Sequence, residues 1–288
     1  SYVKNVVSDI VTRYDISGIH FDDYFYPYPP NNITDEDIDT FSKNHRGFFS
    51  IEDWRRDNVN LLVKSVYDTI NVLKPWVKFG ISPFGIWRNK YEDPEGSATS
   101  GLSNYAELFA DSRKWVKEGW VDYINPQIYF TFTRRVAPFG TLVDWWSNNS
   151  YGRHVYIGQG AYLVNSRAEA AWKNLSEVPR QVRYLRESNR IQGSVYFSSK
   201  SLSTVARSVA DSLRNDLYKY QALPPQMPWL DEVPPNEPQA LTVDALKDGV
   251  HLKWQNPLKA KDGETASGFV IYRFAEGEKI STLDPKIS

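Results

Sequence analysis

The sequence predicts a parallel α/β fold, the second part of a (β/α)8 barrel (TIM barrel), followed by a small all-β unit. Five short apolar segments alternate with segments of helical periodicity, a pattern typical of strands covered by helices. Polar residues gather where these strands end, and no glycine-rich phosphate loop follows any of them. Both features favour a barrel over an open doubly wound sheet.

The predicted elements follow in order from the first residues. Residues 3–13 carry valine and isoleucine at helical spacing, and an apolar strand follows over residues 18–22. Ser50, with acidic residues in the next turn, predicts a helix that ends before Pro75, and strand 77–82 comes next. A helix from Ser103 to Gly119 then leads into strand 121–129, despite Pro126.

The same alternation continues to residue 222. It predicts a strand over residues 155–159, a helix over 167–187, a strand over 193–198 and a last helix beginning near Ser201. Five strands do not close a barrel of eight, so about three further βα units are expected before residue 1. We therefore assign residues 1–222 to a barrel domain that lacks its first strands.

A proline-rich linker over residues 223–238 separates this domain from the C-terminal segment. Residues 239–243, 250–254 and 268–273 alternate apolar and polar side chains, as half-buried strands do. Residues 239–288 thus resemble the first strands of a fibronectin type III sandwich, and their number fits only about half of such a domain.

Composition excludes several kinds of function. The net charge is −1 without a basic cluster, so nothing indicates a nucleic acid partner, and no membrane-spanning segment is visible. There is no cysteine, which excludes disulfides and thiolate metal sites, and no motif calls for a cofactor. Aromatic residues make up 15% of the chain, a supply of flat faces that suit sugar rings.

The most informative segment is GIHFDDYFYP, residues 18–27, in which an apolar strand runs into two carboxylates and an aromatic loop. Alternation along the strand places His20, Asp22 and Tyr24 on one face. Asp23 points the other way, where a turn or helix-capping role is an equal alternative to catalysis. His20 is expected to bind substrate or to orient Asp22. A metal is not expected, because no second histidine lies at ligand spacing.

Residues at or beyond the strand ends are expected to line a cleft next to Asp22. They are Trp87, Asn125, Gln127 and Tyr129. The long segment from Tyr24 to Ser50 is expected to act as a lid or binding loop, in which Tyr24, Tyr26 and Tyr28 stack on sugars. A rigid polyproline turn around residues 27–30 is the alternative.

Glycoside hydrolysis normally uses two carboxyl groups across the scissile bond, and the second one is hard to find. Asp93 and Glu95 are candidates in the loop after the second strand, whereas Asp111 falls in a predicted helix, where it is expected to pair with an arginine. Two explanations stay open. Asp22 and Asp23 divide the acid and base work with help from a 2-acetamido group of the substrate, or the partner lies on a strand outside this chain.

Four motifs within residues 1–222 resemble those of one family. They are GIHFDDYFYP (18–27), ISPFGIWR (81–88), ADSRKWV (110–116) and DYINPQIY (122–129). Through them the chain resembles the bacterial glycosyl-hydrolase-like proteins of the YngK and YddW type. The resemblance implies a TIM-barrel hydrolase of cell-envelope glycans, such as peptide-free peptidoglycan or another N-acetylated polysaccharide. It also implies a periplasmic or extracellular protein, often lipid-anchored through an upstream segment.

A more distant similarity bears on mechanism. Chitinase-type barrels end a strand in D-G-x-D-x-D-x-E, and this pattern puts His20 and Asp22 at the last two aspartates and Tyr24 at the catalytic glutamate. Amylase-type barrels would place their nucleophile at Asp22. Because the glutamate is missing, two functions remain: a glycoside hydrolase with Asp22 and Asp23 as catalytic residues, or a non-catalytic glycan-binding scaffold whose fibronectin-like tail contacts other envelope proteins.

Overall fold

The structure is a computed structural model that describes residues 1–28, 36–166, 169–220, 222–272 and 274–278. It divides into two compact units, Ser1–Lys219 and Tyr220–Ser288. In the described part of the chain, no helix combines the length and apolar character that crossing a membrane requires.

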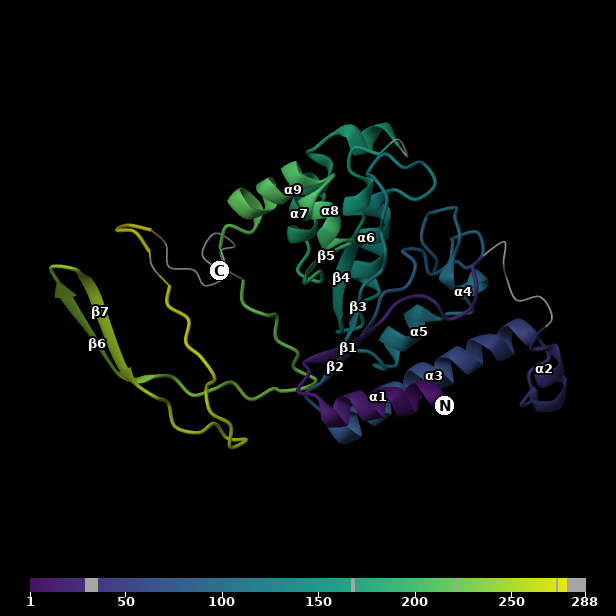
Figure 1. The fold of residues 1–288 in the computed structure, drawn as a ribbon, viewed down its shortest axis with the longest axis horizontal. Helices are drawn as coiled ribbons and strands as arrows, with labels where there is room; N and C mark the ends of the chain where they lie inside the picture. Colours follow the sequence, from purple (N-terminus) through teal and green to yellow (C-terminus); the bar gives the residue numbers. More distant parts are fainter. Residues whose placement is uncertain (29–35, 167–168, 221, 273, 279–288) are drawn as a thin grey trace. The chain divides into compact units, whose positions relative to one another are not determined.

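A five-stranded parallel sheet forms the centre of the first unit. Its strands are β1 (Gly18–Phe21), β2 (Lys78–Ile81), β3 (Tyr123–Ile124), β4 (His154–Gln159) and β5 (Gly193–Tyr196). Each strand pairs in parallel with the next one along the chain, in the order β1-β2-β3-β4-β5 (Figure 1). A doubly wound sheet would reverse this order at a switch point, whereas a barrel wall keeps it. The α/β sheet is therefore compatible with part of a TIM barrel.

Helices cover one face of this sheet. The first unit contains α1 (Tyr2–Arg13), α2 (Ile38–Asn44), α3 (Ile51–Leu73), α4 (Asn104–Glu107), α5 (Ser112–Lys117), α6 (Phe139–Asn148), α7 (Glu177–Arg186), α8 (Ser199–Ser203) and α9 (Arg207–Ser212), with single turns at Ala161–Leu163 and Ala170–Lys173 and a π-helical turn at Leu213–Leu217. Of these, α2 contacts α3 and lies away from the sheet. Figure 1 shows α1 lying beside α3. Phe79, Ile81 and Ile157 on the strands share one buried core with apolar residues of α1, α3 and α6.

The other face of the sheet carries polar and aromatic side chains, and a glycine determines how they meet. Gly80 lies between His20 and Tyr123 in the strand register. A Cβ at position 80 would lie 2.1 Å from the Tyr123 ring, so only glycine lets this ring cross β2. The Tyr123 hydroxyl consequently reaches Nδ1 of His20 at 2.9 Å.

Two predicted helices are shorter in the structure. The segment from Ser103 to Gly119 contains α4 and α5, because Phe109 adopts a φ of +51° and Asp111 starts a new helix as its N-cap. Of the helix predicted over residues 167–187, the structure has α7 and a preceding single turn, and residues 167–168 lie outside the described part.

Two further expectations differ in detail. Strand 121–129 is reduced to the two residues of β3 followed by isolated bridges at Gln127, because Pro126 has no N–H to donate to the ladder. The segment between Tyr24 and Ser50 is not without regular structure, since it contains α2.

The second unit contains one antiparallel hairpin, β6 (Gln239–Leu246) and β7 (Gly249–Gln255). The third predicted strand does not form over residues 268–272, and residue 273 lies outside the described part. Every residue of β6 is exposed, so no second sheet covers it within the described residues. Of the predicted fibronectin-like sandwich, the described residues thus form a two-stranded sheet.

Candidate active site

A cavity of about 770 Å³ opens at the carboxyl ends of β1, β2, β3 and β5, the end at which TIM barrels bind substrates. Its polar wall consists of His20, Asp22, Asp23, Ser82, Asn125 and Gln127, and its aromatic wall of Tyr24, Tyr28, Phe84, Tyr129, Phe130, Tyr162, Tyr196 and Phe197. A cavity of this volume is large enough for a ligand of several hundred daltons.

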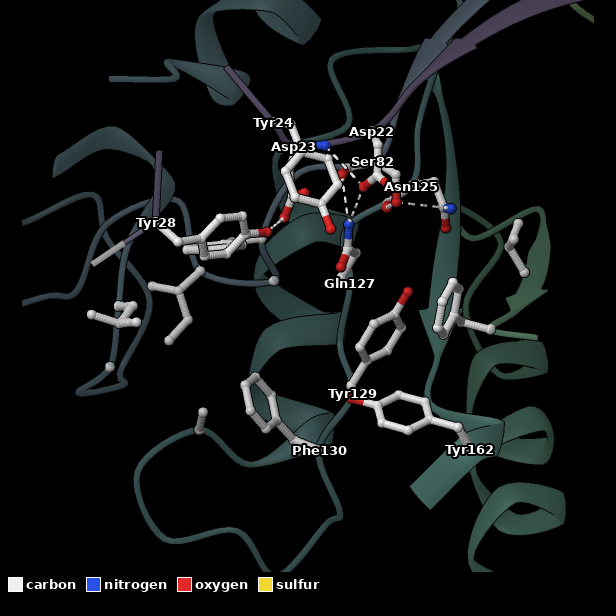
Figure 2. A pocket seen from close by; sticks show the side chains of 18 of the residues that line it. Asp22, Asp23, Tyr24, Tyr28, Ser82, Asn125, Gln127, Tyr129, Phe130 and Tyr162 are labelled. Atoms are coloured by element: carbon white, nitrogen blue, oxygen red, sulfur yellow. Dashed lines mark hydrogen bonds between the residues drawn. The ribbon is translucent and has the colours of Figure 1, made fainter. Parts of the chain in front are cut away.

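Asp22 is the first residue after β1, and its carboxylate is exposed and held from two sides. Its Oδ1 accepts hydrogen bonds from Nε2 of Gln127 and from the backbone N–H of Asp23, both at 2.9 Å. The same Gln127 nitrogen donates to the Ser82 carbonyl at 2.9 Å. Figure 2 shows the Gln127 amide between these two acceptors. Residues after three neighbouring strands thus fix the orientation of one carboxylate.

Asp23 is buried, with 2% of its surface exposed, and its Oδ2 accepts a hydrogen bond from the Tyr28 hydroxyl (Figure 2). Burial raises the pKa of Asp23 to about 6; the Tyr28 hydrogen bond opposes this shift, and the adjacent Asp22 carboxylate adds to it. Asp23 therefore keeps its proton at pH values where an ordinary aspartate has lost it, as a general acid must.

Replacing Tyr28 with Phe should raise the pKa of Asp23 above about 6, because the hydroxyl that stabilises its carboxylate is removed. Titration of the Asp23 carboxyl carbon by NMR measures this directly. Tyr26→Phe is the matched control, since Tyr26 lies in the same segment but does not line the cavity. A lower or unaltered Asp23 pKa in Tyr28→Phe would contradict this assignment.

Tyr129 links the polar and aromatic walls. Its ring stacks on Phe197 at 6.2 Å and meets Tyr162 edge-on at 5.8 Å. Figure 2 shows its hydroxyl directed toward the cluster around Gln127. Burial, followed by the charge of Asp22, raises the pKa of the Tyr129 phenol, so it remains a neutral hydrogen-bond donor.

Three other predicted residues also line the cavity. Asn125 is 3% exposed, and its Oδ1 has no hydrogen-bond partner among the described residues. Partial burial lowers the pKa of His20, against the effect of the Asp22 charge, and its Nδ1 contacts Tyr123 rather than Asp22. Tyr24 is 77% exposed, with its ring centre 5.5 Å from that of Tyr28.

Trp87 and Tyr26 do not line the cavity, contrary to prediction. Trp87 is buried; its Nε1 donates to Asp111 at 2.8 Å and its ring stacks on Trp145. The indole, not an arginine side chain, is thus the Asp111 partner in the described structure. Tyr26 packs edge-on against Phe109 at 5.0 Å. Both residues lie in loops, where the alternation of a strand no longer predicts direction.

The loop carboxylates considered as a second catalytic acid are occupied elsewhere. They form ion pairs, Asp93 with Arg88 at 2.8 Å and Glu95 with Arg113 at 2.7 Å. Among the described residues, Asp22 and Asp23 are the only acidic residues that line the cavity. One acidic group with metal-ligand spacing, formed by Asp231, Asp262 and Glu264, is exposed in the second unit.

Sequence reasoning missed part of the site. Ser82 and Phe197 directly follow β2 and β5, so the strand-end rule could have identified them as lining residues. Tyr28 was expected to stack on sugars, but the structure adds its hydrogen bond to Asp23. Tyr162 lies in the single turn Ala161–Leu163 and Arg134 in a loop, and no sequence pattern marks either residue.

Comparison with known proteins identifies the family. Residues 1–174 match the model of the family described as Glycosyl hydrolase-like 10. The chain belongs to the glycosyl hydrolase-like 10 family. The resemblance found in the four motifs is confirmed at this level, and the Asp22–Asp23 cavity is the candidate active site of a glycosyl hydrolase-like 10 protein.

Two relatives carry glycosyl hydrolase names. The chain is 44% identical over 287 residues to "Glycosyl hydrolase YngK" of Bacillus subtilis strain 168, an alignment that covers 98% of this chain and 56% of the relative. It is 41% identical over 182 residues to "Glycosyl hydrolase DigH" of Escherichia coli K12, an alignment that covers 62% of this chain and 41% of that relative. The chain thus spans about half the length of the relatives it matches. These names support a glycosidase role.

Proposed function

We propose that the protein is a glycoside hydrolase of bacterial cell-envelope glycans, acting on peptide-free peptidoglycan or another N-acetylated polysaccharide. The observation that carries this proposal is the Asp22–Asp23 pair, an exposed carboxylate oriented by Gln127 next to a buried carboxyl group with a pKa of about 6. Two adjacent carboxyl groups in different environments, one exposed and one buried, can take different roles in one reaction. Membership of the glycosyl hydrolase-like 10 family supports the reaction type.

In the first step Asp23 acts as the general acid. It transfers its proton to the glycosidic oxygen while the bond from that oxygen to the anomeric carbon breaks. Since adjacent residues supply both cavity carboxylates, neither is expected on the far side of the sugar ring. The carbonyl oxygen of a 2-acetamido group takes that place and forms the new bond to the anomeric carbon.

Asp22 stabilises the intermediate of this reaction. Its carboxylate accepts a hydrogen bond from the acetamido N–H, where positive charge develops as the ring closes. In the second step a water molecule attacks the anomeric carbon and gives its proton to the Asp23 carboxylate, while the bond to the acetamido oxygen breaks. The acetamido group and the Asp23 proton are then restored.

The proposed substrate determines the remaining assignments. A polymer of the cell envelope is encountered in the periplasm or at the cell surface, so we place the protein there, with or without a lipid anchor. Polysaccharide is the proposed partner of the cavity, and contact with envelope proteins is the proposed role of residues 239–288.

Release of reducing ends tests the proposed function. The full-length protein is incubated with peptide-free peptidoglycan strands and with chitin oligomers, and new reducing ends are counted while glycan binding is measured in parallel. Release from at least one polymer is expected. Binding without release from either would show the alternative, a glycan-binding scaffold that lacks turnover.

A further inference from the structure

One basic side chain in the cavity points to substrate specificity. Arg134, in the loop between β3 and α6, lines the cavity, and among the described lining residues it is the only arginine or lysine. Its nearest lining residues in sequence are apolar, namely Phe130, Val136 and Ala137. A guanidinium in an apolar wall needs acceptors for its N–H groups, and Glu169 supplies one for Nη1 alone.

Arg134 is held by an anchored carboxylate. Its Nη1 donates to Oε1 of Glu169 at 3.0 Å, and Oε2 of Glu169 accepts a hydrogen bond at 2.7 Å from Oγ1 of the fully buried Thr131. The guanidinium carbon lies 5.9 Å from the centre of the Phe130 ring. These contacts fix the position of the side chain from one side and still leave 41% of it exposed.

Glu169 leaves part of the guanidinium without a hydrogen-bond partner. Glu169 engages Nη1 alone, and Nε is buried with no hydrogen-bond partner among the described residues. Nη2 makes no hydrogen bond with the described residues, and a guanidinium N–H binds a carboxylate oxygen with both charge attraction and a hydrogen bond. A neutral sugar hydroxyl offers the hydrogen bond without the charge attraction.

We propose that Arg134 binds a carboxylate carried by the saccharide, either on the ring of a uronic acid or on the ether side chain of an amino sugar. This inference rests on the proposed function and deepens it. In peptidoglycan the ether carboxylate is bound in an amide while the peptide is present and is free once the peptide is removed. Arg134 therefore favours stripped strands over peptide-bearing ones, and over neutral glycans such as chitin.

Carboxyl reduction provides the test. Peptide-free peptidoglycan strands are compared with the same strands after their carboxyl groups have been converted to alcohols. We expect the full-length protein to show a kcat/KM about tenfold to hundredfold higher on the unreduced strands, mainly through KM. In Arg134→Gln this ratio should fall to near one, and Arg134→Lys, which keeps the charge but loses the fork, should lie between.

Arg135→Gln is the matched control, because Arg135 is the exposed next residue and does not line the cavity. It should keep the preference of the unmutated protein. Competition by oligouronates and by muramic acid oligomers then identifies the source of the carboxylate, since the better inhibitor carries the preferred group.

Three results would overturn the inference. One is equal kcat/KM on reduced and unreduced strands, which would leave the glycosidase proposal intact. Another is an equal loss on both substrates in Arg134→Gln, as expected if the residue only anchors Glu169. If the unmutated protein cleaves neither the unreduced nor the reduced strands, the proposed function fails, and Arg134 is tested by binding instead. Equal dissociation constants for oligosaccharides from the unreduced and the reduced strands would then be the third contradicting result.

Discussion

Asp22→Asn in the full-length protein should lose nearly all hydrolysis, with kcat lowered by about a hundredfold to ten-thousandfold. Asn has the same shape and retains an oxygen for the Gln127 and Asp23 N–H donors, so the local structure is preserved. It lacks the negative charge that the proposed intermediate requires. Glycan affinity should change little, because the aromatic wall, the neutral donors and Arg134 all remain.

Reducing-end release gives kcat for this variant, and calorimetric titration with an oligosaccharide gives its dissociation constant. Asp93→Asn is the matched control, since it removes a carboxylate that pairs with Arg88 and does not line the cavity. It should retain turnover. Substantial hydrolysis by Asp22→Asn would refute the catalytic assignment of this residue.

Most of the sheet could be predicted because its strands are short and apolar, and β2 and β4 in its interior are also buried. Strand β4, for example, was expected over residues 155–159 and extends over His154–Gln159. Strand β3 is shorter than predicted because Pro126 interrupts the ladder. The break between α4 and α5 depends on the backbone of Phe109, whose positive φ is set by packing that no local pattern encodes.

The site could be predicted as far as strand ends determine it. Asp22, Asn125 and Gln127 follow parallel strands and therefore meet at one edge of the sheet. Trp87 and the Asp23–Tyr28 hydrogen bond could not be predicted in the same way, because loops decide their positions and loop paths depend on tertiary contacts.

Adjacent positions give the two aspartates different environments. Asp22 is exposed and accepts hydrogen bonds from an amide side chain and a backbone N–H, which hold its carboxylate in one orientation. Asp23 turns into the protein, where burial favours its protonated form. One change of direction at a strand end thus places an oriented, exposed carboxyl group and a buried proton donor within a single dipeptide.

Asp23→Asn should lower kcat on the natural glycan by about a hundredfold to ten-thousandfold, because no proton reaches the leaving oxygen. An aryl glycoside with a dinitrophenol leaving group needs no such proton, so its kcat/KM, which reports the first step, should fall far less. Asp22→Asn should impair both substrates, since the charge of the intermediate does not depend on the leaving group. This contrast separates the two roles.

The pH dependence gives a second measurement of the same role. A general acid works only while protonated, so activity of the unmutated protein on the glycan should fall as the pH rises through about 6, the pKa of Asp23. The fall should be absent from Asp23→Asn assayed with the aryl glycoside. Two results would show that another group donates the proton. One is an equal loss of activity on the natural glycan and the aryl glycoside in Asp23→Asn, and the other is a fall of that variant's activity at the same pH as in the unmutated protein.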